Sequence, residues 1–586
     1  MNTTTNTYVY EFLGKPENVF YSLIHCIEKG KKKKLLWGFH SYVKAYNKIK
    51  EGDEVFLYAT SPISTYVASG YVESKFIDEQ KFWPIDSKYG DTWPKRVWIR
   101  VEYICINDDI LNLLRKSSQG MAINVDYYQL SKYYSNLKYE IGSVPASKHS
   151  PIARGVIHKI DGEYANKIRK ILAKYSIKVS TNLREVFNDL IKVEEATNTG
   201  LRHLKALILL HFLTGKNVII IGPPGSGKTS LAINICKTLG INPHIITGNP
   251  EWTPFDTIGG RDINGIFRPG IITNIIIRCW ESLKNNGVFE FLIIDEINRA
   301  NVDLAFGRLF TLLDVKYRDS PLIERTEGLG DAFKDVLINN NLYLPYSFRI
   351  IATMNSYDKA LLFKLGYALL RRFAIVEMRR NFKFEPNPQG WIEKVKEFVK
   401  EVKSCDIEKS VNLDIIENEF HLTRSEFDDY VLIDSILQII LKRYNGIKGV
   451  LEKLAMNLGL TYSDILSLIY KIICTINEKL SEFNVEITEA PIADTIKFLV
   501  ISTLLDEIWA SQHLATLLDE AFSSYIIPQL DILADKVRAE RLGLLPVKGA
   551  KRLKEELEEL SKMMEELTLN RSYKQLKRLA EGESIL

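Results

Sequence analysis

The 586-residue sequence has few of the residues that crosslink small secreted folds. Its six cysteines are scattered without a CxxC pair, so we expect free thiols in a reducing cytoplasm and no cysteine-based metal site. No uncharged apolar run reaches the roughly 18 residues of a membrane span. The polar residues 1–10 lack the basic and apolar pattern of a secretory signal. We see no internal repeat and no low-complexity segment.

The composition is that of a soluble globular protein, and its charge is unevenly distributed. Hydrophobic residues make up 46% and charged residues 26%, which argues against a disordered chain, a collagen or a disulfide scaffold. The net charge is +4, but residues 1–175 hold 26 Lys and Arg against 18 Asp and Glu, and the rest hold 51 against 55. This basic segment suits a module that meets a polyanion, and a solvated basic face is the commoner alternative.

The pattern of apolar residues predicts several domains. Residues 1–165 carry alternating, aromatic strand-like runs such as Arg96–Tyr103, and residues 216–380 alternate apolar strands with helices, as a parallel α/β sheet does. We therefore predict a mainly β domain at 1–165, a helical connector at 166–215, an α/β core at 216–380, a helical lid at 381–545 and an amphipathic helix at 546–586. The strands predicted in the core are Asn217–Ile221, Pro243–Thr247, Val288–Ile294, Phe348–Met354 and Ala374–Met378.

The C-terminal segment has a short apolar repeat. The spacing alternates between four and three residues along Leu553, Leu557, Leu560, Met564 and Leu567. This spacing is typical of an amphipathic helix packed on its own domain or of a short coiled coil, and the first alternative is favoured because the repeat covers only about two heptads.

A glycine-rich segment between a predicted strand and a predicted helix fits the P-loop pattern. Its residues are Gly222, Pro223, Pro224, Gly225, Ser226, Gly227, Lys228 and Thr229, and Ser230 opens the helix. The glycines let backbone N–H groups face phosphate oxygens. We expect Lys228 to contact the β- and γ-phosphates and the Thr229 hydroxyl to ligate Mg²⁺.

Two carboxylates follow the apolar strand that ends at Ile294. Asp295 and Glu296 would lie at the carboxyl edge of the sheet, where the P-loop also lies. We expect Asp295 to hold Mg²⁺ directly or through water, and Glu296 to polarise the attacking water, as a Walker B pair does.

Asn355 ends a further apolar strand, a position that resembles the sensor-1 Asn of AAA+ proteins, which orients the lytic water, and a capping Asn is the alternative. Arg371 and Arg372 precede the fifth strand and are candidates for arginine fingers that reach the nucleotide of a neighbouring subunit. The alternative is a surface pair that makes salt bridges, and the sequence does not say which arginine acts in trans.

Together these segments resemble the McrB family of AAA+ proteins, the motor subunits of modification-dependent restriction systems. The resemblance rests on GPPGSGKT (222–229), LIIDEINRAN (292–301), ATMNSYDKAL (352–361) and ALLRRFAIVE (368–377). It implies a GTPase that uses Mg²⁺, a hexameric ring, a separate McrC-like nuclease subunit and an N-terminal domain that recognises modified DNA. It adds Arg299 as a catalytic candidate and Asp358 as a nucleotide-binding candidate. A MoxR-like ATPase that remodels proteins, with ATP in place of GTP, is the alternative.

The N-terminal region resembles PUA-like domains of the EVE and YTH type. The resemblance rests on Leu35-Leu-Trp-Gly38, Lys50–Tyr58 and the Trp-Pro pairs at 83–84 and 93–94. It implies a cage of Trp37, Trp83 and Trp93 around a flipped, methylated base, since aromatic stacking offsets the cost of unstacking. Tryptophans that pack in the domain core are the alternative, and RNA is an alternative ligand to DNA.

Overall fold

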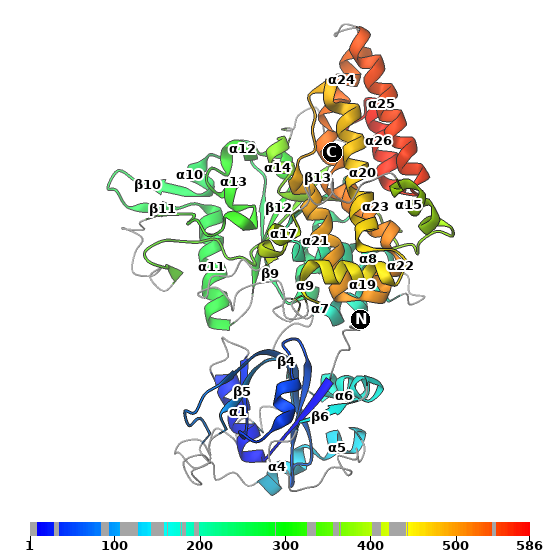
Figure 1. Ribbon diagram of the computed structural model, residues 1–586. Helices are drawn as coiled ribbons and strands as arrows, with labels where there is room; N and C mark the ends of the chain where they lie inside the picture. The colour runs from blue at the N-terminus through cyan, green and yellow to red at the C-terminus, as the bar shows by residue number, and fades with distance from the viewer. Residues whose placement is uncertain are drawn as a thin grey trace. The chain divides into compact units, whose positions relative to one another are not determined.

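The computed structural model of the chain divides into two compact units (Figure 1). The first contains residues 1–182 and 434–446, and the second contains 183–433 and 447–586. The residues that the structure describes are 9–28, 34–83, 93–105, 110, 127–141, 157–160, 162–175, 177–178, 183–192, 199–286, 289–324, 336–355, 363, 365–400, 412–420, 437, 441, 444–541 and 547–586.

A mostly antiparallel sheet forms the first unit. Its strands run in the order β2 (Lys34–Phe39), β5 (Lys95–Ile104), β4 (Thr65–Ile77), β3 (Glu54–Ala59), β1 (Val9–Gly14) and β6 (Ile157–Ile160), and β7 (Ile177–Lys178) pairs with β5. The strands β1 and β3 are parallel, and the other pairs are antiparallel. The helical segments of this unit are α1 (Pro16–Glu28), η1 (Lys44–Lys48), α4 (Tyr127–Tyr133), α5 (Ser135–Ile141) and α6 (Gly162–Tyr175).

The first unit extends beyond the predicted boundary at residue 165. Helix α6 places Ala165, Ile168 and Leu172 in the apolar core beneath the sheet, because these residues lie on one face of the helix. The predicted connector at 166–215 is therefore divided. Helix α6 belongs to the first unit, and α7 (Leu183–Ile191) and α8 (Thr199–Leu213) belong to the second.

A parallel five-stranded sheet lies at the centre of the second unit. Its strands run in the order β14 (Phe373–Glu377), β8 (Asn217–Gly222), β13 (Ile350–Asn355), β12 (Glu290–Asp295) and β9 (Asn242–Thr247). All five strands that the sequence predicted are present, with ends shifted by at most two residues. Every pair is parallel, so the carboxyl ends of all five strands meet at one edge.

Helices cover both faces of this sheet at its central strands, which explains why β8, β12 and β13 are apolar along most of their length. Ile219 and Ile294 join one core with Ile276 of α11 (Ile271–Asn286). On the other face, α8 and α9 (Lys228–Leu239) lie against the strands, and Phe212 of α8 meets Phe291 with ring centroids 5.4 Å apart. A strand buried on both faces needs apolar residues at successive positions.

Short elements connect the strands of the sheet, and in Figure 1 α10, β10, β11, α12 and α13 lie together on one side of it. A group of helices follows β14 in the sequence. The short elements are α10 (Pro254–Thr257), β10 (Gly259–Arg261), β11 (Phe267–Pro269), η3 (Ile297–Arg299), α12 (Val302–Ala305), α13 (Leu309–Leu312), η4 (Val315–Tyr317) and α14 (Tyr367–Leu370). The later helical segments are α15 (Trp391–Val399), α17 (Leu413–Phe420), α19 (Gly446–Met456), α20 (Tyr462–Leu480), η7 (Ser481–Phe483), α21 (Glu489–Leu505), α22 (Glu507–Gln512), α23 (Leu514–Tyr525), η8 (Ile527–Leu530), α24 (Ile532–Arg541), α25 (Val547–Glu566) and α26 (Asn570–Ala580). Within the ranges described above, no helix is both long and apolar enough to span a bilayer.

The C-terminal segment is a helical hairpin that packs on its own unit. All five apolar residues of the predicted repeat are buried, and α25 lies against α26 and α24. Helix α26 is attached to α23, because both carboxylate oxygens of Asp519 accept backbone N–H groups, from Arg571 at 2.7 Å and Ser572 at 2.8 Å. The buried Arg571 side chain also donates to the carbonyl of Ile375 in β14 at 3.2 Å, so the hairpin contacts the central sheet.

Leu557→Ala tests whether this repeat stabilises the unit itself. Leu557 is fully buried, and removing such a side chain costs about 2–5 kcal/mol. We expect a lower thermal midpoint and faster hydrogen exchange in α25 and α26. Glu555→Ala, on the exposed face of the same helix, should change neither. Unchanged stability with an altered oligomeric state would support the coiled-coil alternative instead.

Candidate functional site

The glycine-rich loop joins the end of β8 to the start of α9. Gly225 and Gly227 have φ angles of 71° and 94°, a region in which side chains other than glycine are strained. The loop and the first turn of α9 make a concave arrangement of backbone amides at the positive end of the helix dipole. The predicted residues from Gly222 to Thr229 therefore lie together, and Ser230 lies in the first turn of α9.

Lys228 is buried at the start of α9, only 6% exposed. Its ammonium group donates to the carbonyls of Gly222 at 3.0 Å and Pro223 at 2.9 Å, and to Asn355 Oδ1 at 2.8 Å. Burial lowers the pKa of Lys228, and the carboxylates of Asp295 and Glu296 oppose that shift. The positive charge is thus held beside two negative groups at the carboxyl edge of the sheet.

Asp295 ends β12 beside the loop. Its Oδ1 accepts hydrogen bonds from Thr229 Oγ1 and Thr353 Oγ1, each at 2.6 Å. In the described part of the chain, no group of three or more His, Cys, Asp and Glu side chains gathers around a metal position. Mg²⁺ commonly takes one or two protein oxygens together with substrate phosphates and water, so Thr229 and Asp295 form a donor set that fits it.

Glu296 and Asn355 complete the site. Asn355 Nδ2 donates to Glu296 Oε1 at 2.9 Å, and Arg299 Nε makes an ion pair with the other carboxylate oxygen. Glu296 has a φ angle of 54°, and a Cβ on Gly248 would come within 2.4 Å of the Glu296 carbonyl. Gly248 therefore lets the loop after β9 approach the strained turn that aims the Glu296 side chain.

Sequence reasoning missed Gly248 and Thr353. Thr353 Oγ1 donates to Asp295 and accepts the backbone N–H of Glu296 at 3.0 Å, so one hydroxyl positions both acidic residues. Thr353 could have been predicted from its position two residues before Asn355, because alternate residues of a strand lie on the same face.

Comparison with known proteins assigns the segment that carries this geometry. Residues 217–373 match the model of the AAA domain (dynein-related subfamily). This segment is an AAA domain. A restriction enzyme component of Bacillus subtilis (strain 168), "Type II restriction enzyme BsuMI component YdiS", is 30% identical over 195 residues. That alignment covers 27% of this chain and 56% of the relative, so the chain spans a little over half of that protein's length.

A solved structure shows a more distant likeness. It is a crystal structure from Cytophaga hutchinsonii ATCC 33406, provisionally described as an ATPase, which is 16% identical with a TM-score of 0.31. The match covers 58% of this chain and 84% of that chain.

Arg371 and Arg372 lie at the opposite edge of the AAA domain's sheet from the P-loop. Both precede β14, and the Arg372 carbonyl accepts from Asn217 N at the start of β8. The six residues of β8 separate this edge from the P-loop by roughly 17 Å at 3.3 Å per residue. The structure therefore does not bring these arginines to the nucleotide site of the same chain. Asp358 lies outside the described residues.

The three tryptophans of the predicted cage do not meet. Trp37 is 3% exposed in the main core of the first unit, and Trp83 and Trp93, at 2% and 9%, form a separate cluster with Leu36. Side chains of β2 alternate between faces, so Trp37 points away from the face that Leu36 and Gly38 present to Trp83. The prediction of one cage built from all three is wrong for this reason, and the core alternative describes Trp37.

The indole nitrogens of the second cluster are occupied within the domain. Trp83 Nε1 donates to Ser22 Oγ at 2.9 Å and Trp93 Nε1 to His40 Nε2 at 2.8 Å. The rings of Trp83 and Trp93 lie with centroids 5.1 Å apart and an interplanar angle of 62°, which is an edge-to-face contact. A base held by stacking needs two roughly parallel rings with space between them, and the Trp83 and Trp93 rings are not arranged in that way.

Trp37→Ala should act on stability. Removal of a buried tryptophan costs about 3–5 kcal/mol, so we expect the first unit to melt several degrees earlier, measured by calorimetry of the full chain. Trp98→Ala is the control, because Trp98 is only partly buried, against the smaller cluster, and its loss should lower the melting temperature less. Loss of a base preference with unchanged melting would contradict the core assignment.

Thr353→Val tests the positioning role of the missed hydroxyl. The variant leaves Asp295 and the Glu296 amide each short of one hydrogen bond, a loss of about 1–3 kcal/mol for a buried group. We expect kcat to fall about ten-fold or more with nucleotide affinity little changed, measured by steady-state hydrolysis and equilibrium binding. Thr353→Ser keeps the hydroxyl and should restore kcat. Equal activity of Thr353→Val and Thr353→Ser would show that the Thr353 hydroxyl does not position the acidic residues.

Proposed function

We propose that this chain is the nucleotide-hydrolysing motor subunit of a modification-dependent restriction system. The observation that carries the proposal is the hydrogen-bonded series from Lys228 through Asn355 to Glu296, beside the Thr229–Asp295 pair. A lysine, a hydroxyl–carboxylate pair and a second carboxylate lie together at one sheet edge, which supports their proposed roles as phosphate-binding cation, Mg²⁺ ligands and base.

Each residue has a distinct part in the proposed hydrolysis. Lys228 and the loop amides hold the β- and γ-phosphates, and Thr229 and Asp295 hold Mg²⁺, which neutralises charge on the phosphates. Glu296 accepts a proton from the attacking water. Asn355 orients Glu296 and, through its contact with Lys228, keeps the base close to the terminal phosphate. Arg299 forms an ion pair with Glu296. The positive charge of Arg299 therefore influences how strongly the Glu296 carboxylate accepts a proton.

The arginines point to an assembly of several copies. Arg371 and Arg372 lie at the far edge of the sheet, so they can act on a nucleotide only when that nucleotide is bound to another subunit. We propose a homo-oligomeric ring, hexameric by resemblance to the McrB family, in which each chain completes the site of its neighbour. The preference for GTP over ATP is supported by that resemblance alone.

Two observations support the restriction-system context. The chain is similar over 195 residues to a named component of a Type II restriction enzyme, and residues 1–175 carry a basic excess suited to a nucleic acid backbone. We propose that the N-terminal unit binds modified DNA and that the ring activates a separate McrC-like nuclease. The base-recognition surface is not the three-tryptophan cage.

The proposal is tested by nucleotide hydrolysis of the full chain with GTP and with ATP, in the presence of methylated DNA, unmethylated DNA or RNA. We expect the hydrolysis rate to be higher with GTP than with ATP. In a separate binding measurement we expect methylated DNA to bind more tightly than unmethylated DNA or RNA. Glu296→Gln should retain nucleotide binding and lower hydrolysis by about 10²–10⁴-fold, the range for losing a general base. Lys228→Ala should lose binding.

The outcomes separate the alternatives. Unchanged hydrolysis in Glu296→Gln would refute the catalytic assignment. ATP preference without any effect of nucleic acid would favour a MoxR-like ATPase that remodels proteins, and tightest binding of RNA would favour an RNA-binding module.

A further inference from the structure

Helices α4 and α5 follow each other in the first unit and form one amphipathic segment (Figure 1). The backbone N–H of Lys138 donates to the carbonyl of Tyr134 at 2.8 Å, and that of Tyr134 donates to Ser131 at 3.2 Å, so the helical path continues from one helix into the next. The residues on its inner side are buried in the core of the unit and recur every three or four positions, as Leu130, Tyr134, Leu137 and Ile141. This spacing leaves the opposite side of both helices facing outward.

Tyr134 fixes which side of the segment faces the core. Its hydroxyl donates to the carbonyl of Cys105, just after β5, at 2.7 Å, and its ring lies with its centroid 6.0 Å from that of Phe20 in α1. Burial raises the pKa of Tyr134, so the hydroxyl keeps its proton and this hydrogen bond. Contacts on the inner side therefore hold the outward side in one orientation.

Three tyrosine rings lie on the outward side. Tyr128, Tyr133 and Tyr139 are 77%, 43% and 87% exposed. Tyr128 and Tyr139 are eleven positions apart, which is close to three helical turns, so they lie on one side of the helical path with Lys132 between them. Eleven positions span roughly 16 Å along a helix, and stacked bases follow one another at about 3.4 Å. The rings are therefore spread over the length of several bases.

The exposed charges around these rings are mostly basic. Lys132 and Lys138 are exposed on α4 and α5. Lys167 and Lys170 are exposed on α6, which packs against α5. Among the side chains that the structure describes on these three helices, Glu163 is the one exposed acid. The surface is therefore complementary in charge to a polyanion.

A nucleic acid fits this surface better than a protein partner does. Every aliphatic side chain of α4 and α5 is buried, so the surface lacks the apolar centre that a protein interface buries, and lysine is depleted in such interfaces. Lysines beside aromatic rings are typical of proteins that bind single strands, because phosphates contact the lysines and bases stack on the rings. A duplex keeps its bases stacked inside the double helix, so the rings favour a single strand.

We infer that the outward side of α4, α5 and α6, which we call the tyrosine face, binds single-stranded nucleic acid without reading its sequence. Bases stack on Tyr128 and Tyr139, and phosphates contact Lys132 and the other exposed lysines. The inference rests on the proposed function for nucleic acid as the ligand of the first unit. It goes beyond that function because the strand needs no modified base. The strand is DNA or RNA, and the test includes both.

The test is equilibrium binding of the full chain to a labelled oligothymidylate of about 12 nucleotides, followed by fluorescence anisotropy. Tyr128→Ala and Tyr139→Ala should each weaken binding about five-fold or more, because a ring on which a base stacks is lost. Tyr128→Phe and Tyr139→Phe keep the ring and should bind as the parent chain does. Tyr317→Ala is the matched control, because Tyr317 is a 44% exposed tyrosine of the second unit, and it should change nothing.

The salt dependence of binding measures the phosphate contacts. Lys132→Met should weaken binding and reduce the slope of log affinity against log salt concentration by about 0.7, the contribution of one phosphate contact on a single strand. Lys396→Met, on the exposed side of α15, is the control and should leave the slope unchanged. The same slope in Lys132→Met and in the parent chain would contradict phosphate binding at the tyrosine face.

Two further ligands identify what the face binds. Tighter binding of oligothymidylate than of oligouridylate assigns the face to DNA, the reverse order assigns it to RNA, and equal binding assigns it to single strands of either kind. A duplex of the same length should bind Tyr128→Ala and the parent chain alike. Unchanged oligothymidylate binding in both alanine variants would overturn the inference and favour a protein partner for the tyrosine face.

The oligonucleotides carry no modified base, so this test and that of the proposed function can fail separately. Loss of the preference for methylated DNA, with tyrosine-dependent binding of oligothymidylate intact, would refute the proposed recognition and leave the tyrosine face. A clear preference for methylated DNA, with oligothymidylate binding independent of Tyr128 and Tyr139, would refute the tyrosine face alone.

Discussion

The amide side chain of Asn355 connects opposite charges at the centre of the nucleotide site. It accepts from the buried ammonium group of Lys228 and donates to the carboxylate of Glu296, so both are held in place without meeting as a direct ion pair. A direct pair would neutralise the cation that phosphates need and the base that water needs. The proposed hydrolysis depends on keeping these two groups near each other and separate, and an amide is suited to this because it has both a donor and an acceptor.

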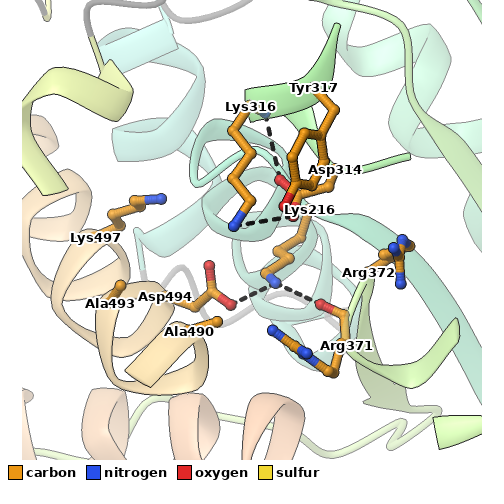
Figure 2. Close-up of a pocket in the computed structure, with 10 residues that line it drawn as sticks. All are labelled: Lys216, Asp314, Lys316, Tyr317, Arg371, Arg372, Ala490, Ala493, Asp494 and Lys497. Atoms are coloured by element: carbon orange, nitrogen blue, oxygen red, sulfur yellow. Dashed lines mark hydrogen bonds and ion pairs between the residues drawn. The ribbon is translucent and has the colours of Figure 1, made fainter. Parts of the chain in front are cut away.

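The parallel sheet separates two kinds of charge at its two edges. At the carboxyl edge, Asp295 and Glu296 surround one lysine and the positive end of α9. At the amino edge, several lysines and arginines surround two aspartates in a small cavity beside α21 (Figure 2). Because the six residues of β8 separate the edges, the second edge cannot act on phosphates held by the first within one chain.

In the first unit, side chains of successive strand residues point to opposite faces of the sheet, and this decides where the tryptophan side chains pack. Trp37 lies one residue after Leu36, and this step moves its ring to the other face of the sheet, into the main core. Trp83 and Trp93 remain together and use their indole nitrogens for contacts within the domain. The basic excess of residues 1–175 therefore remains the observation that supports the proposed binding of DNA.

The sequence by itself determined the five strands of the sheet, the phosphate loop and the polar residues that end β12 and β13, because each depends on local pattern and on the rule that parallel strands share one carboxyl edge. Tertiary structure decided the rest. Thr353 and Gly248 became part of the site only through contacts with Asp295 and Glu296 on another strand. The face occupied by Trp37, the packing of α6 on the first unit and the basic cavity beside α21 all depend on residues far apart in the chain. Neither the composition nor the periodicity of the sequence indicates which residues that are far apart in the chain come into contact in the fold.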